Sequence, residues 1–171
     1  MHLVTIFSRA ARSRRGIAGI LVGLAVIGLA LSGAFTGQAA QARNALVAGQ
    51  SIPSAAVARL EVIAASFAKY NGGHQPDWVT AVMTTHARAL DSATPGDLEP
   101  QSANVVVYLI TMEGDFIGYE ASPPAGAALP TGRYLSIVVN ARTYAVMDWG
   151  LSPKAPPVSP ASLGPVRRLV G

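Results

Sequence analysis

The chain has 171 residues, with 13 lysines and arginines, 9 aspartates and glutamates and no cysteine, and its formal net charge is +4. This length suits one ordinary domain, and the lack of cysteine excludes disulfides, thiol catalysis and thiolate metal sites. Four of the basic residues precede residue 16, so the rest of the chain is close to neutral. Nucleic-acid binding needs a basic face that neutralises phosphates, and we therefore expect no nucleic-acid partner.

Residues 1–42 have the order of a secretory leader. Four arginines come first, an uncharged apolar run follows over residues 16–35, and small residues lie around Ala42. This order predicts a signal peptide, but an apolar run of about 20 residues can also cross the roughly 30 Å bilayer core as a retained signal anchor. In both cases the arginines keep the N-terminus in the cytoplasm. We predict a protein that is secreted, or anchored in the plasma membrane with its C-terminal domain outside. Arg14-Arg15 also resembles a twin-arginine signal, which leaves the export route open.

A linker over residues 43–51 leads to the outer domain, which we place at residues 52–150. Its first predicted element is a helix within residues 52–73, because apolar residues recur there at helical spacing. Asn71-Gly72-Gly73 is a suitable C-terminal stop. The apolar face of this helix consists of Val57, Leu60, Ala64 and Phe67.

Residues 78–90 fit either a strand or a helix, and their aromatic and β-branched start favours a strand. Residues 104–112 are apolar on both faces, which is typical of a central strand. Glu113-Gly114-Asp115 then predicts a turn into a strand that begins at Phe116.

Residues 133–141 and 143–149 predict a second hairpin, with Leu135, Ile137 and Val139 on one face. The expected architecture is α+β, with one helix packed on a three- to five-stranded antiparallel sheet. Residues 151–171 are rich in proline, which interrupts both helix and sheet pairing, and we predict a tail that acts as a spacer.

The second hairpin carries a resemblance to a known family. Its turn reads Asn140-Ala141-Arg142-Thr143-Tyr144 between two apolar strands, and this resembles the Asp-Ala-x-Thr-Gly hairpin of PepSY-type domains of exported bacterial proteins. Asn140 stands where that pattern has aspartate, and Tyr144 where it has glycine. The resemblance implies a non-catalytic module that regulates or inhibits a peptidase. The chain also resembles small uncharacterised secreted proteins of high-GC Gram-positive bacteria.

Catalytic, metal and cofactor signatures are missing from the sequence. Hydrolysis needs a nucleophile beside a base, but there is no GxSxG motif, and the outer domain has only two histidines, His74 and His86. Glu113 and Asp115 flank a glycine without the ligand spacing of a calcium loop. We therefore predict no catalytic, cofactor-binding or metal-ligating residue, and no cofactor. A glycosidase-type pair of Glu113 with Glu120 or Asp148 depends on distances that the sequence does not give.

Aromatic side chains are the remaining indication of function, because aromatic residues on an exposed sheet face are typical of protein-binding surfaces. If Tyr134, Tyr144 and Trp78 face outward, they are candidates for a partner surface. We expect a non-enzymatic extracytoplasmic binding or accessory protein, whose partner is a peptidase, a peptide or a cell-wall component.

Two other functional classes stay open. One is a small extracytoplasmic hydrolase, which a cleft joining His86 to Glu113, Asp115 or Asp148 would favour. The other is a structural accessory subunit that an uncleaved N-terminal helix anchors in the membrane.

Overall fold

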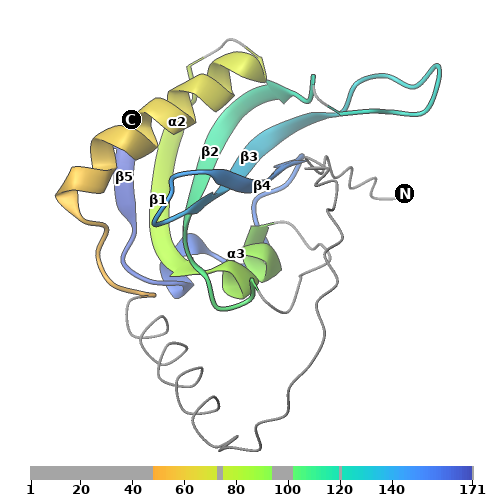
Figure 1. Ribbon diagram of the computed structural model, residues 1–171. Helices are drawn as coiled ribbons and strands as arrows, with labels where there is room; N and C mark the ends of the chain where they lie inside the picture. Colours follow the sequence, from red (N-terminus) through yellow and green to blue (C-terminus); the bar gives the residue numbers. More distant parts are fainter. Residues whose placement is uncertain (1–47, 73–74, 94–101, 120, 171) are drawn as a thin grey trace, which may run out of the picture.

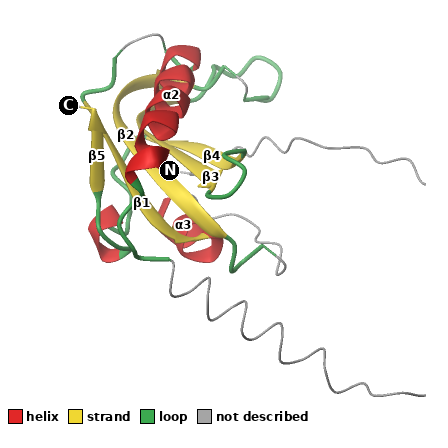
Figure 2. Ribbon diagram, turned by 60° about the vertical axis from the view of Figure 1, so that its left-hand side comes forward, coloured by secondary structure: helices red, strands yellow, loops and turns green. Residues whose placement is uncertain are grey.

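The computed structural model describes residues 48–72, 75–93, 102–119 and 121–170. They form a five-stranded antiparallel sheet with one main helix on it, which confirms the α+β class (Figures 1 and 2). The predicted leader, residues 1–42, lies outside the described residues, as do His74 and Glu120. Within the described ranges, none of the helices has the length and apolar character needed to cross a membrane.

The strands are β1 (Trp78–Thr85), β2 (Val106–Ile117), β3 (Thr131–Asn140), β4 (Val146–Ser152) and β5 (Arg167–Val170), and their order in the sheet is β4-β3-β2-β1-β5. All four pairings are antiparallel. The central strand β2 is buried without interruption over residues 107–112, as its apolar sequence predicts. The edges of the sheet are β4 and β5.

Helix α2 (Ser54–Tyr70) covers one face of the sheet. Its buried residues recur every four positions, so they form one stripe along the helix: Ala56, Leu60, Ala64 and Ala68. They pack on alternate residues of β1, β2 and β3, among them Leu135, Ile137 and Val139. The shared face that the sequence predicts for these three residues is thus confirmed.

The end of α2 is tied to β2. Asn71 is 1% exposed, and its side-chain Nδ2 donates to the Phe67 carbonyl at 3.0 Å. Its own carbonyl accepts a hydrogen bond from the backbone N–H of Ile117 at 2.7 Å. Gly72 follows with φ +151°, and a Cβ there would lie 2.8 Å from the carbonyl oxygen of Asp115. Only glycine fits this close approach of two backbones.

Helix α3 (His86–Ala93) corrects the prediction of one strand over residues 78–90. The strand β1 ends at Thr85, and the chain is helical from His86. In this helix His86, Ala89 and Leu90 are buried on the sheet face opposite α2. Their spacing of three and four residues lets one helical face cover the strands, which no extended chain would do.

The predicted turn at Glu113-Gly114-Asp115 is also corrected. Strand β2 continues through these residues to Ile117, and its pairing with β3 shifts register between Glu113 and Phe116. Such a β-bulge lets the strand bend without ending. Phe116 is 3% exposed and belongs to the core under α2.

The proline-rich segment is part of the domain, in contrast to the predicted tail. Since β4 and β5 lie at opposite edges, residues 153–166 cross the sheet between them. They do so beside α3, because the Ser92 hydroxyl donates to the Val158 carbonyl and Arg88 Nη2 donates to the Ser162 carbonyl, both at 3.0 Å. Leu163 is buried with the core on that face.

Candidate functional site

The edge strand β4 is half-exposed along its whole length. Its register places Trp149 opposite Ile137 and Leu151 opposite Leu135, so both side chains lie on the face that α2 covers. Helix α2, however, packs mainly against β2 and β5 and does not extend over this edge (Figure 1). The side chains here are consequently packed against the core but open on one side.

We call the open apolar side chains of this edge the β4 strip: Val146, Trp149 and Leu151. All three are half-buried hydrophobic residues that pack on the core under α2. Beside it, the backbone of β4 presents its outer edge, which no described strand pairs. Unpaired backbone donors and acceptors next to apolar side chains are the features that recruit a further strand.

The β3–β4 turn closes one end of this surface. Asn140 Oδ1 accepts backbone hydrogen bonds from Arg142 at 2.9 Å and Thr143 at 3.1 Å. Tyr144 has φ +59°, a left-handed conformation that is costly for a side chain larger than glycine. The turn therefore holds the Tyr144 ring in place despite local strain.

Tyr144 lies in a stack of three side chains. Its ring is stacked on that of Tyr108, with centroids 6.1 Å apart, and the guanidinium carbon of Arg59 lies 4.8 Å from the Tyr144 centroid. Burial, together with the nearby Tyr144, raises the pKa of the Tyr108 hydroxyl. We call this the Arg59–Tyr144–Tyr108 stack.

A second cluster lies on the opposite face, at the other end of β1, β2 and β3. The carboxylate of Glu113 accepts hydrogen bonds from Trp78 Nε1 and from Arg133 Nε, the latter at 2.9 Å. The bond from Arg133, then that from Trp78, lowers the pKa of Glu113. The Trp78 and Tyr134 rings are 6.4 Å apart. Side chains of β1 and β3 thus both donate to this carboxylate of β2.

His86 and Asp148 form the one catalytic-type pair that the structure brings together among the candidates. His86 Nε2 lies 2.7 Å from Asp148 Oδ2, and the two side chains are 7% and 33% exposed. Because a carboxylate only accepts, the imidazole Nε2–H donates. His86 Nδ1 is buried and has no partner among the described residues. A catalytic triad would place a nucleophile at that atom. The hydrogen bond of the pair joins α3 to β4.

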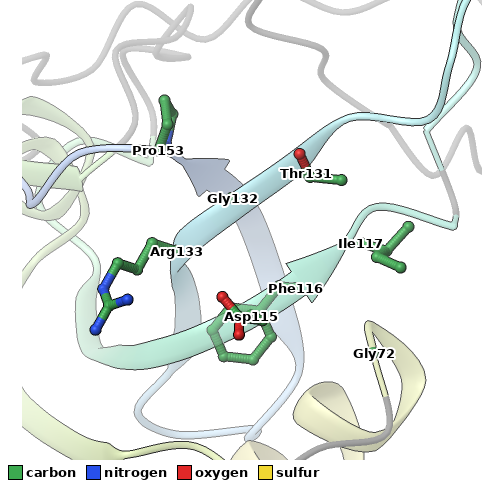
Figure 3. Close-up of a pocket in the computed structure, with 8 residues that line it drawn as sticks. All are labelled: Gly72, Asp115, Phe116, Ile117, Thr131, Gly132, Arg133 and Pro153. Atoms are coloured by element: carbon green, nitrogen blue, oxygen red, sulfur yellow. The ribbon is translucent and has the colours of Figure 1, made fainter.

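A pocket of about 370 Å³ lies near the bulge of β2 (Figure 3). Gly72, Phe116, Gly132 and Pro153 form part of its wall, with Asp115 and Arg133 as its charged residues. The guanidinium of Arg133 is already bonded to Glu113. Neither His86 nor Asp148 lines this pocket.

In the part of the chain that the structure describes, no three histidine or acidic residues come together as potential metal ligands. Glu113 and Asp115 lie in one bulge, but Glu113 is bonded to Arg133 and Trp78.

The three aromatic candidates from the sequence fall on two faces. Trp78 and Tyr134 lie side by side with Glu113, whereas Tyr144 lies on the α2 side. Sequence reasoning noted Trp149 among the aromatic residues that could form a binding surface, but it did not place Trp149 and Leu151 together on an exposed edge. Their alternation with Asp148 and Gly150 is visible, but it does not reveal that β4 is an edge strand.

Comparison with protein-family models, with curated proteins and with solved structures finds no match to this chain.

Proposed function

We propose that this protein is a non-enzymatic binding module that takes an extended segment of a partner protein along the outer edge of β4. The observation that carries the proposal is that β4 is an edge strand, half-exposed over all seven residues, beside the β4 strip. In this mode, backbone hydrogen bonds supply affinity, and alternate side chains of the added strand contact the apolar surface.

The resemblance of the hairpin to PepSY-type domains supports a peptidase as that partner. Asn140 Oδ1 accepts two backbone N–H bonds, a role for which aspartate is equally suited. Tyr144 adopts the left-handed conformation that glycine adopts without strain. Both departures from the family pattern are therefore compatible with the same turn. We infer that the protein regulates or inhibits a peptidase by binding an extended segment of that peptidase along the outer edge of β4.

Capture of a partner by charge-altered variants tests the proposal. The exported full chain is purified from the cell envelope as wild type, Trp149→Lys and Val62→Lys. Val62 is the matched control, because it is 66% exposed on α2 and outside the β4 strip. We expect a peptidase to co-purify with wild type and Val62→Lys and to be lost with Trp149→Lys, provided circular dichroism shows all three folded. Equal capture by all three would show that β4 is not the binding edge.

The location outside the membrane is proposed from the leader alone. Four arginines followed by the apolar run over residues 16–35 support export with the N-terminus inside. The intact mass of the exported protein distinguishes a signal peptide cleaved after Ala42 from a retained anchor. A full-length, leader-bearing protein dissolved in the cytosol would contradict the proposed location.

A further inference from the structure

The positive charge near the β3–β4 turn indicates which kind of peptide segment β4 binds. Arg59 and Arg142 are both exposed, and among the described residues no carboxylate forms an ion pair with either of them. The acidic residue of β4 itself, Asp148, faces the opposite side of the sheet and is bonded to His86. The approach to the first residues of β4 is thus cationic, although the chain beyond the leader is close to neutral.

The Arg59 side chain is preorganised to bind a carboxylate. Its guanidinium lies over the Tyr144 ring, and Tyr144 is in turn stacked on Tyr108, which is 3% exposed. A guanidinium that lies over an aromatic face can still bind a carboxylate in a bidentate manner through the N–H donors at its edge. Because the stack already restrains Arg59, binding loses less side-chain entropy than it would with a free arginine.

The position of the stack relates it to the added strand. Tyr144 precedes β4, which begins at Val146, so the Arg59–Tyr144–Tyr108 stack lies at the turn end of the β3–β4 hairpin, on the face that α2 covers. Resting on the proposed function, we infer that the partner segment is an extended peptide that carries an aspartate or glutamate side chain where it passes Arg59. Apolar residues of the same segment contact the β4 strip.

Matched synthetic peptides test this inference on the full chain. The probes are fluorescently labelled nine-residue peptides of alternating valine and serine, in which one serine position at a time carries glutamate or, as the isosteric control, glutamine. Fluorescence anisotropy measures the dissociation constants at about 50 mM and about 500 mM salt. We expect one glutamate position to bind about fivefold more tightly than its glutamine match, as one well-placed ion pair at a surface gives. The preference decreases at high salt, because screening shortens the range of the interaction.

Two arginine variants locate the preference. Arg59→Gln abolishes the preference for glutamate, whereas Arg168→Gln, which removes the same charge from an exposed position on the opposite edge strand β5, leaves it unchanged. Equal binding of glutamate and glutamine peptides that still depends on Trp149 would overturn this inference and leave the proposed function standing. A glutamate preference that survives Arg59→Gln would also overturn it. Failure of every peptide to bind would refute both.

Discussion

Replacing Gly72 by alanine tests how α2 is fixed to the sheet. A Cβ at this position would lie 2.8 Å from the carbonyl oxygen of Asp115, and φ of +151° is a conformation that alanine rarely adopts. The atom that it meets belongs to the backbone and cannot rotate away. Any shift that relieves the contact also strains the adjoining bond from the N–H of Ile117 to the carbonyl of Asn71, which is 2.7 Å long.

The cost follows from these two contributions. The unfavourable backbone conformation accounts for about 1–3 kcal/mol, and loss of the hydrogen bond for about 0.5–1.5 kcal/mol. We therefore expect Gly72→Ala to lower the free energy of unfolding by about 2–4 kcal/mol. For a domain of this size, each kcal/mol shifts the melting temperature by about 4 °C.

Gly126→Ala is the matched control. Gly126 also has a positive φ, +82°, but a Cβ there would have no atom within 4 Å. In this variant only the unfavourable backbone conformation lowers the free energy of unfolding, by about 1 kcal/mol. Urea unfolding followed by tryptophan fluorescence compares the two. If Gly72→Ala costs no more than Gly126→Ala, the close contact between the end of α2 and β2 does not constrain the fold, and the reasoning is refuted.

Three further changes are expected to alter stability. His86→Ala lowers the free energy of unfolding by about 2–4 kcal/mol in urea, because a buried hydrogen bond to a carboxylate and its packing are lost; a cost below about 0.5 kcal/mol would show that the pair with Asp148 is incidental. Asn140→Ala costs about 1–2 kcal/mol, because two backbone N–H groups lose their acceptor, while Asn140→Asp keeps that acceptor and melts near wild type; equal losses would contradict this role. Since the folded-state pKa of Glu113 is lowered, the unfolded chain binds more protons near its own pKa of about 4.3. The contribution of Glu113 is therefore complete above that pH and is lost as the pH falls through the lower folded-state pKa. The stability difference between wild type and Glu113→Gln should accordingly shrink from pH 6 to pH 3, and a constant difference would argue against the bond to Arg133.

Local sequence patterns predict the elements whose partners are close in the chain. The helix within residues 52–73 and the hairpin around Asn140 are found as expected, because periodicity and turn chemistry act over a few residues. The turn predicted at Glu113-Gly114-Asp115 is wrong, because these residues form a bulge within β2. The same residues suit a turn or a bulge, and β3 decides between them by pairing on both sides, with Tyr134 opposite Glu113 and Gly132 opposite Phe116.

The change from strand to helix at His86 and the path of the last residues depend on distant contacts. The β-branched residues before His86 favour a strand, but burial of Ala89 and Leu90 against the sheet stabilises a helix after it. The prolines after residue 152 prevent local pairing, as the sequence indicates. They do not prevent a crossing connection, and β5, which lies after the last proline, pairs with β1.

The sequence by itself determined the charge division, the uncharged apolar run over residues 16–35, the main helix and the apolar faces of the central strands, since each depends on residue type and short spacing. Only the tertiary structure decided that β4 is an edge, that Asp148 meets His86, and that Arg59 stacks on Tyr144. These contacts join residues 62 to 85 positions apart, and strand order, which no local pattern encodes, brings them together.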